Sequence, residues 1–192
     1  MAKKPALSRK EQVQLTALQL IRSNGIQGAS MADISAGSGV AVGTIYHHFE
    51  SREALIDALR VQLAEQLALS LQAGLSGKGS HKEKIQSLWN NAYAFFSKNP
   101  LAASFMDQYL SSAQGASSSG LLKMKGLSAV SDFLKDAIKQ GKVRKVEAEW
   151  LFEWLLSSVL TTVRVSNNKH MAAIAKKSLD MGAEMCWSAF KA

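Results

Sequence analysis

The hydrophobic positions of the chain recur at helical spacing along its whole length, and the alternating β-branched runs that are typical of strands are missing. In the first periodic segment, Val13, Ala17 and Ile21 fall on one face of a helix. Ser8 precedes this helix as an N-cap, and Gly25 ends it. The predicted fold class is therefore all-α.

The same reasoning predicts about nine helices in all, the later ones over residues 31–38, 42–48, 52–73, 81–98, 100–112, 121–140, 146–165 and 169–190. Gly/Ser-rich stretches at 74–80 and 114–120 interrupt the pattern as a connector and a loop. Asn99 before Pro100 is expected to cap the helix that begins there. The first four helices are expected to form one compact unit of about 50 residues.

Residues 30–49 contain two short helices separated by a turn with Gly39, which is the arrangement of a helix-turn-helix. Ile34, Val40 and Ile45 are spaced to pack the two helices together. The residues left to face outward, on a helix that can enter the major groove, are Gly43, Thr44, Tyr46 and His47. A helical hairpin without a DNA role would show the same apolar spacing, so the pattern alone leaves both interpretations open.

The identities of the residues in this segment narrow that choice. The informative positions are Leu20, Gly25, Ser30, Met31, Ile34, Gly39, Val40, Gly43, Thr44, Ile45, Tyr46, His48, Phe49, Arg52, Glu53, Ala54 and Leu55. In this order they resemble the DNA-binding domain of the TetR (tetracycline repressor) family. The remaining part of the chain matches the family only in length and helix content.

The resemblance implies a homodimeric, ligand-responsive transcription factor, usually a repressor, that binds a near-palindromic operator. Residues 1–55 would be the DNA-binding domain, and residues 56–192 the effector-binding and dimerisation domain. By position in the family motif, the expected phosphate contacts are Ser30, Thr44, Tyr46 and Arg52, and the residues on or near the base-reading face are Val42, Gly43, His47 and His48. The charge of Arg52 and the helix N-terminus beside it also favour a phosphate.

Two positions depart from the family pattern. Ala41 stands where the family often has Ser or Thr as the cap of the recognition helix, so a cap typically worth ~1 kcal/mol is absent. Position 52 is commonly Lys, and Arg52 is a tolerable but not identical exchange for a phosphate contact.

Aromatic residues at helical spacing mark the middle of the chain. Such stripes are usually core, but with the resemblance some of them are expected to line a pocket for a small apolar or aromatic effector. The predicted ligand-binding residues are Trp89, Tyr93, Phe96, Phe105, Met106 and Tyr109, with Leu122, Met124 and Phe133 as weaker candidates. The polar neighbours Asp107 and Gln108 could orient a polar group of the ligand, although we expect both to face solvent.

The last two predicted helices are apolar on more than one face, which is more than a monomer core would use. Small residues along them would let two helices approach closely across a twofold axis. The residues expected in a homodimer interface are Trp154, Ser158, Thr162, Ile174, Ser178, Gly182 and Met185.

Composition adds a few constraints. The net charge of +8 and the pI of about 9.6 favour a polyanionic partner, although only the first ten residues concentrate the basic groups. Cys186 is the single cysteine, which excludes an intrachain disulfide and a cysteine-rich zinc site and indicates a reducing compartment. The longest uncharged apolar run, residues 154–163, is too short for a membrane helix. The chain is therefore expected to be a cytoplasmic protein without a membrane partner.

No residue pattern indicates catalysis, a cofactor or a metal ion. The adjacent His47 and His48 diverge by about 100° on a helix and lack further ligands at suitable spacing. Gly77, Lys78 and Gly79 lack the strand and the third glycine of a dinucleotide-binding loop. The alternatives that stay open are a regulator without an effector, a helical partner-binding module that uses the apolar C-terminal helices, and a helical enzyme with a vestigial helix-turn-helix.

Overall fold

The computed structural model describes residues 6–112, 120–168 and 172–192, the side chains of 172–180 excepted. Within these residues the α-helices are α1 (Arg9–Asn24), α2 (Met31–Ser38), α3 (Val42–His48), α4 (Arg52–Leu75), α5 (His81–Lys98), α6 (Pro100–Leu110), α8 (Ser128–Lys139), α9 (Ala148–Ser166) and α10 (Ala172–Phe190). Two short 3₁₀ helices, η1 (Ile26–Gly28) and η2 (Lys125–Leu127), accompany them. The described residues contain no strand, and the all-α prediction is confirmed.

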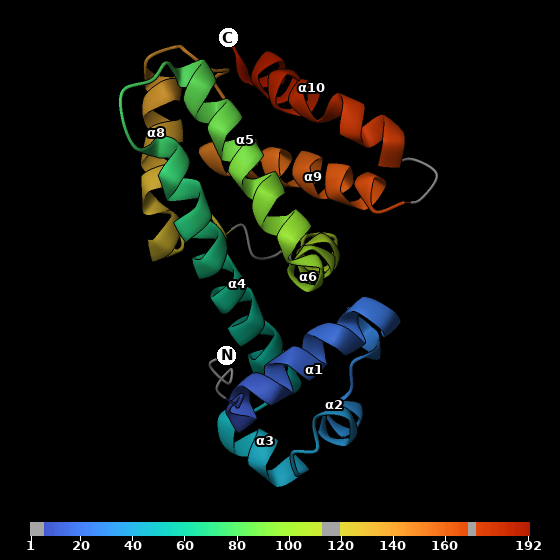
Figure 1. Ribbon diagram of the computed structural model, residues 1–192. Helices are drawn as coiled ribbons and strands as arrows, with labels where there is room; N and C mark the ends of the chain where they lie inside the picture. Colours follow the sequence, from blue (N-terminus) through green and yellow to red (C-terminus); the bar gives the residue numbers. More distant parts are fainter. Residues whose placement is uncertain (1–5, 113–119, 169–171) are drawn as a thin grey trace.

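The helices form a small N-terminal head and a larger helical core (Figure 1). The head consists of α1, α2 and α3, and α4 runs from the head along the full length of the core. α5 lies beside α4 and also packs against α9 and α10, which lie side by side on the outer side of the core. The head touches the core a second time, where α1 packs against α6.

The three helices of the head pack on one another through buried apolar side chains. Ala17 of α1, Ile34 of α2 and Ile45 of α3 are fully buried together. Gly39 ends α2 in the left-handed region at φ 67°, where glycine carries no steric penalty, and so makes the sharp turn into α3. The structure thus confirms the predicted helix-turn-helix.

Serine side chains cap the starts of α1, α2 and α4. The hydroxyl oxygens of Ser8, Ser30 and Ser51 each accept a hydrogen bond from the backbone N–H three residues later. Ala41 makes no side-chain cap, so α3 begins without one, as the sequence indicated. α3 must therefore be held in place by packing and by its neighbours rather than by its own cap.

Arg52 is one of those neighbours. Its Nε donates a hydrogen bond of 2.9 Å to the carbonyl oxygen of Ala29, and its Nη2 donates to the carbonyl oxygen of Ile26. Ala29 and Ile26 are both buried, so water has little access to these carbonyls. The guanidinium therefore ties the start of α4 to the segment before α2.

Two expectations about the helices are wrong. The helix expected from residue 121 begins only at Ser128, because turns and η2 precede it; a Cβ built on Gly126 would lie 3.3 Å from Cβ of Ala68, so η2 packs closely on α4. Asn99 does not cap α6 with its side chain. Its Nδ2 instead donates to the carbonyl oxygen of Phe95 and so closes the end of α5.

Trp89 lies at the centre of the larger core. Its indole is 1% exposed, and its Nε1 donates a hydrogen bond of 3.1 Å to the hydroxyl of Ser158 on α9. On α10, a Cβ built on Gly182 would lie only 2.5 Å from Cζ2 of this indole. The small residue at position 182 therefore serves packing within the chain, whereas the sequence had suggested an approach between two chains.

Replacing Gly182 with alanine should destabilise the core. The new methyl group collides with a fully packed ring, so we expect Gly182→Ala to lower the free energy of unfolding by ~1–3 kcal/mol. Gly43→Ala is the matched control, because nothing lies within 4 Å of a Cβ built there and helix propensity alone should raise stability by up to ~1 kcal/mol. Urea denaturation followed by circular dichroism measures both changes, and equal stabilities would contradict this packing.

Removing the guanidinium of Arg52 should loosen the head. Arg52→Ala leaves two buried carbonyls without donors, and we expect a loss of ~1–3 kcal/mol in the unfolding free energy. Arg52→Lys should recover part of it, since an ammonium group still supplies a donor. Arg9→Ala, at an exposed arginine of the same head, should change stability little. Thermal denaturation compares the stabilities of the three variants. Equal losses of stability in Arg52→Ala and Arg9→Ala would contradict a stabilising role for the Arg52 hydrogen bonds.

Candidate functional site

The outer face of α3 is available to a partner. Val42 is 40% exposed and Tyr46 is 48% exposed, although both are large side chains with apolar surface. Gly43, His47 and His48 are exposed beside them. Ile45, on the opposite side of α3, is fully buried and fixes the rotation of the helix. The predicted base-reading residues therefore lie together on one accessible surface.

The four residues predicted to contact phosphates differ in their exposure and in the hydrogen bonds that they already make. The Tyr46 ring faces outward, whereas Thr44 is half-buried. The Ser30 hydroxyl accepts the Asp33 N–H at 3.1 Å, although the residue itself is exposed. The side chain of Arg52 is 19% exposed and already donates to two carbonyls of the head. A phosphate role for these four residues stays a prediction. For Arg52 it would compete with the hydrogen bonds that this side chain donates to Ala29 and Ile26.

Lys10 is a further cation at this surface that the sequence motif did not single out. Its Nζ lies 5.8 Å from the centroid of the Phe49 ring, directly after α3. The only sequence signal for it was the excess of basic groups among the first ten residues. α1 thus brings a positive charge next to the recognition helix.

The predicted ligand-binding residues pack as core. Phe96, Phe105 and Met106 are at most 1% exposed. The Phe105 and Tyr109 rings stack with centroids 5.8 Å apart, and those of Trp89 and Tyr93 stack at 5.6 Å. Of the six residues, only Trp89 lines one of the cavities described below. The structure therefore gives no support to the prediction that these side chains surround a common pocket.

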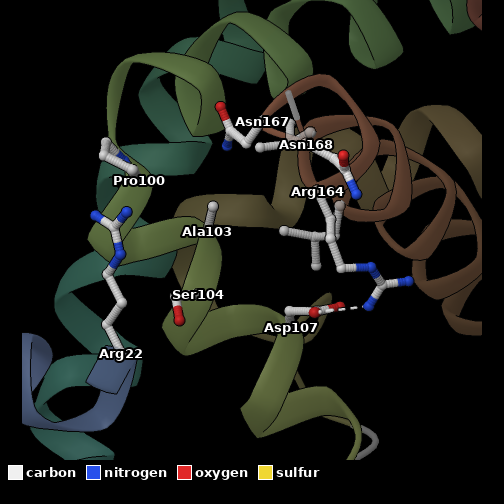
Figure 2. Close-up of a pocket in the computed structure, with 10 residues that line it drawn as sticks. Arg22, Pro100, Ala103, Ser104, Asp107, Arg164, Asn167 and Asn168 are labelled. Atoms are coloured by element: carbon white, nitrogen blue, oxygen red, sulfur yellow. Dashed lines mark hydrogen bonds and ion pairs between the residues drawn. The ribbon is translucent and has the colours of Figure 1, made fainter. Parts of the chain in front are cut away.

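A cavity of about 280 Å³ lies instead between the head and the core (Figure 2). Arg22 reaches it from α1, and residues of α6 and of the C-terminal end of α9 complete its walls. Its polar residues are Arg22, Ser104, Asp107, Arg164, Asn167 and Asn168. Nη1 of Arg164 lies 3.0 Å from a carboxylate oxygen of Asp107, whose side chain is 35% exposed, so Asp107 reaches solvent in part and is also paired.

Gln108 joins the core to the head close to this cavity. Its Oε1 accepts the backbone N–H of Ile26 at 2.8 Å, and its Nε2 donates to the carbonyl oxygen of Ile21 at 3.0 Å. The expectation that Gln108 would face solvent is wrong, because it is half-buried and both ends of its amide are bonded to backbone groups. A single amide on α6 therefore satisfies two backbone groups at the C-terminal end of α1.

α9 and α10 expose an apolar face. Trp150 is 56% exposed, Trp154 37%, Met181 59% and Met185 62%. A hollow of about 380 Å³ on this face is lined by the predicted interface residues Trp154, Ser158, Thr162, Gly182 and Met185, together with Trp89 and Cys186. Ile174 and Ser178 were also predicted there and lie outside the described side chains.

Among the described residues, no three His, Cys, Asp or Glu side chains gather to hold a metal ion. No helix in the described part of the chain is long and apolar enough to cross a membrane.

Both parts of the chain match known families. Residues 15–59 match the bacterial regulatory proteins of the tetR family, and residues 81–191, more than half of the chain, match the tetracyclin repressor-like C-terminal domain. The HTH-type transcriptional regulator UidR of Escherichia coli K12 is 27% identical over 130 residues, which are 66% of this chain and 65% of UidR. The chain thus spans slightly less than two thirds of the length of this relative.

Solved structures agree with this assignment. A TetR-family transcription regulator from Shewanella sp. PV-4 superposes with a TM-score of 0.84 at 25% identity, over 97% of this chain and 100% of that one. FadR of Bacillus subtilis, solved in complex with stearoyl-CoA, shares the fold with a TM-score of 0.70 at 19% identity, over 93% and 98%. These relatives are transcriptional regulators and not enzymes. The chain therefore belongs to the TetR family of DNA-binding transcriptional regulators.

Proposed function

We propose that this regulator is a ligand-responsive repressor that binds a near-palindromic operator as a homodimer in the cytoplasm. The observation that carries the proposal is the accessible face of α3, which presents Tyr46 and His47 outward while Ile45 anchors it. We place the DNA-binding domain at residues 1–55 and the effector-binding and dimerisation domain at 56–192. α4 crosses that boundary without a break.

On DNA, α3 of each subunit would lie in the major groove. A twofold dimer presents its two recognition helices about one turn apart, ~34–36 Å, or slightly more, so the operator would share that symmetry. Tyr46, and Lys10 beside the Phe49 ring, would contact phosphates, which position the protein. Gly43, His47 and His48 would lie nearest the base edges.

The exposed apolar face of α9 and α10 supports the homodimer. Trp150, Trp154, Met181 and Met185 together leave a large apolar surface in water, which is unfavourable for a monomer. The hollow beside Trp154 can receive a side chain from a second copy. A symmetric pair of such faces would bury both surfaces at once.

The contact between α6 and α1 supports ligand responsiveness. Because Gln108 bonds to both Ile21 and Ile26, a ligand that shifts α6 would act directly on the head. A regulator of the same fold has been solved in complex with stearoyl-CoA. A coupling of ~1–3 kcal/mol between the two sites would change operator affinity about 5- to 150-fold.

The operator is found by selection of bound fragments from a random DNA library, followed by footprinting. His47→Ala should then relax the base preference at one position in each half-site by ~1–3 kcal/mol, while the salt dependence stays nearly unchanged. His81→Ala is the matched control, since His81 stacks on Phe133 at the far end of the core. Selection of no sequence by the folded wild-type protein would overturn the proposed function.

A charge on the apolar face should dissociate the dimer. Met185→Glu places a carboxylate in the proposed interface, where desolvation strongly disfavours it, so we expect a monomer at micromolar concentration. Leu69→Glu is the control, because Leu69 is 71% exposed on α4, away from α9 and α10. Sedimentation velocity distinguishes the two species, and a monomeric wild-type protein would refute the homodimer.

A further inference from the structure

The cavity between the head and the core carries two arginines on opposite sides (Figure 2). Arg22 belongs to α1 in the head, and Arg164 belongs to α9 in the core. The close-up shows the Arg22 side chain beside the first turns of α6, with Arg164 across the hollow from it. Any ligand that contacts both side chains would connect the head directly to the core.

The charges of the lining favour an anion. The lining contains two guanidinium groups and one carboxylate, that of Asp107, so it carries a net positive charge. Arg22 makes no hydrogen bond or ion pair with another described residue. Arg164 uses one of its nitrogens, Nη1, for Asp107, so its other donors stay available. Arginine forks bind carboxylates and phosphates through paired hydrogen bonds.

The remaining walls define the rest of the ligand. Ala103, Leu160 and Val163 are at most 8% exposed and supply an apolar lining, while Ser104 and Asn167 add polar groups. A volume of about 280 Å³ suits a compact molecule. The lining therefore fits an acid with a small apolar body.

We propose that this cavity binds a small organic acid whose carboxylate is held by Arg22 while its body reaches the walls that α6 and α9 supply, and that the bound acid fixes the head to the core. This inference rests on the proposed function only for its effect on DNA. The acid supplements the amide contacts of Gln108, which attach the same end of α1 to α6. It therefore biases the position of the two heads in the dimer and with it the affinity for the operator.

Direct binding tests the site without DNA. Isothermal titration with benzoate, phenylacetate and hexanoate should detect at least one bound acid, whereas the matching neutral amides should not bind. Arg22→Gln should weaken that acid about tenfold or more, because a charge-assisted pair is lost. Arg9→Gln, at an exposed arginine on the same helix, should leave the affinity unchanged. Asp107→Asn should raise the affinity severalfold, because it removes the opposing carboxylate.

Three results would overturn the proposal: no acid binds, an amide binds as well as its acid, or Arg22→Gln binds the acid like the wild type.

A second experiment, operator binding with and without the acid, separates this proposal from the proposed function. Arg22→Gln should bind the selected operator normally in the absence of acid and lose the response of that binding to the acid. Intact operator binding with no response in the wild type overturns this inference and leaves DNA binding standing, whereas failure to select an operator overturns the function alone.

Discussion

α4 is the constraint on which the rest of the structure depends, because one continuous helix runs from the head along the length of the core. Leu55 and Leu59, near its start, and Leu67 and Leu71, further along, are all fully buried in one continuous hydrophobic cluster. A helix of 24 residues is about 36 Å long and behaves as a stiff rod. A small rotation of α4 against α5 must therefore displace the head. A change of packing in the core would shift the position of α3 in this way.

The contact between α1 and α6 gives the head a second point of attachment. With α4 alone, the head could turn about the axis of one helix. Gln108 limits this turn through two hydrogen bonds to the backbone of the head, at Ile21 and Ile26. Ile26 also accepts a hydrogen bond from Arg52, so the same short segment receives contacts from the core and from the start of α4. The position of the reading face thus depends on these polar contacts as well as on the packing of α1 against α6.

The sequence predicted best those features that local chemistry decides. Ser8, Ser30 and Ser51 cap within three residues of themselves, and Gly39 turns the chain without help from distant residues. The roles of Gln108 and Arg52 depend on partners 82 and 23 positions away, which no local pattern reveals. Helical spacing showed that Phe96 and Phe105 face inward, but inward-facing residues of packed core and of a pocket wall share the same spacing. The cavity itself is formed by Arg22 and Arg164, which look like ordinary surface charges in the sequence.

The buried thiol of Cys186 can report how often the core around it opens. It is the single thiol of the chain, it is 1% exposed at the hollow between α9 and α10, and burial raises its pKa to about 12. Only a thiolate reacts quickly with alkylating reagents, so in the closed structure the residue is both shielded and protonated. Its rate of alkylation in the native protein therefore measures how often this part of the core opens, with no probe to be introduced.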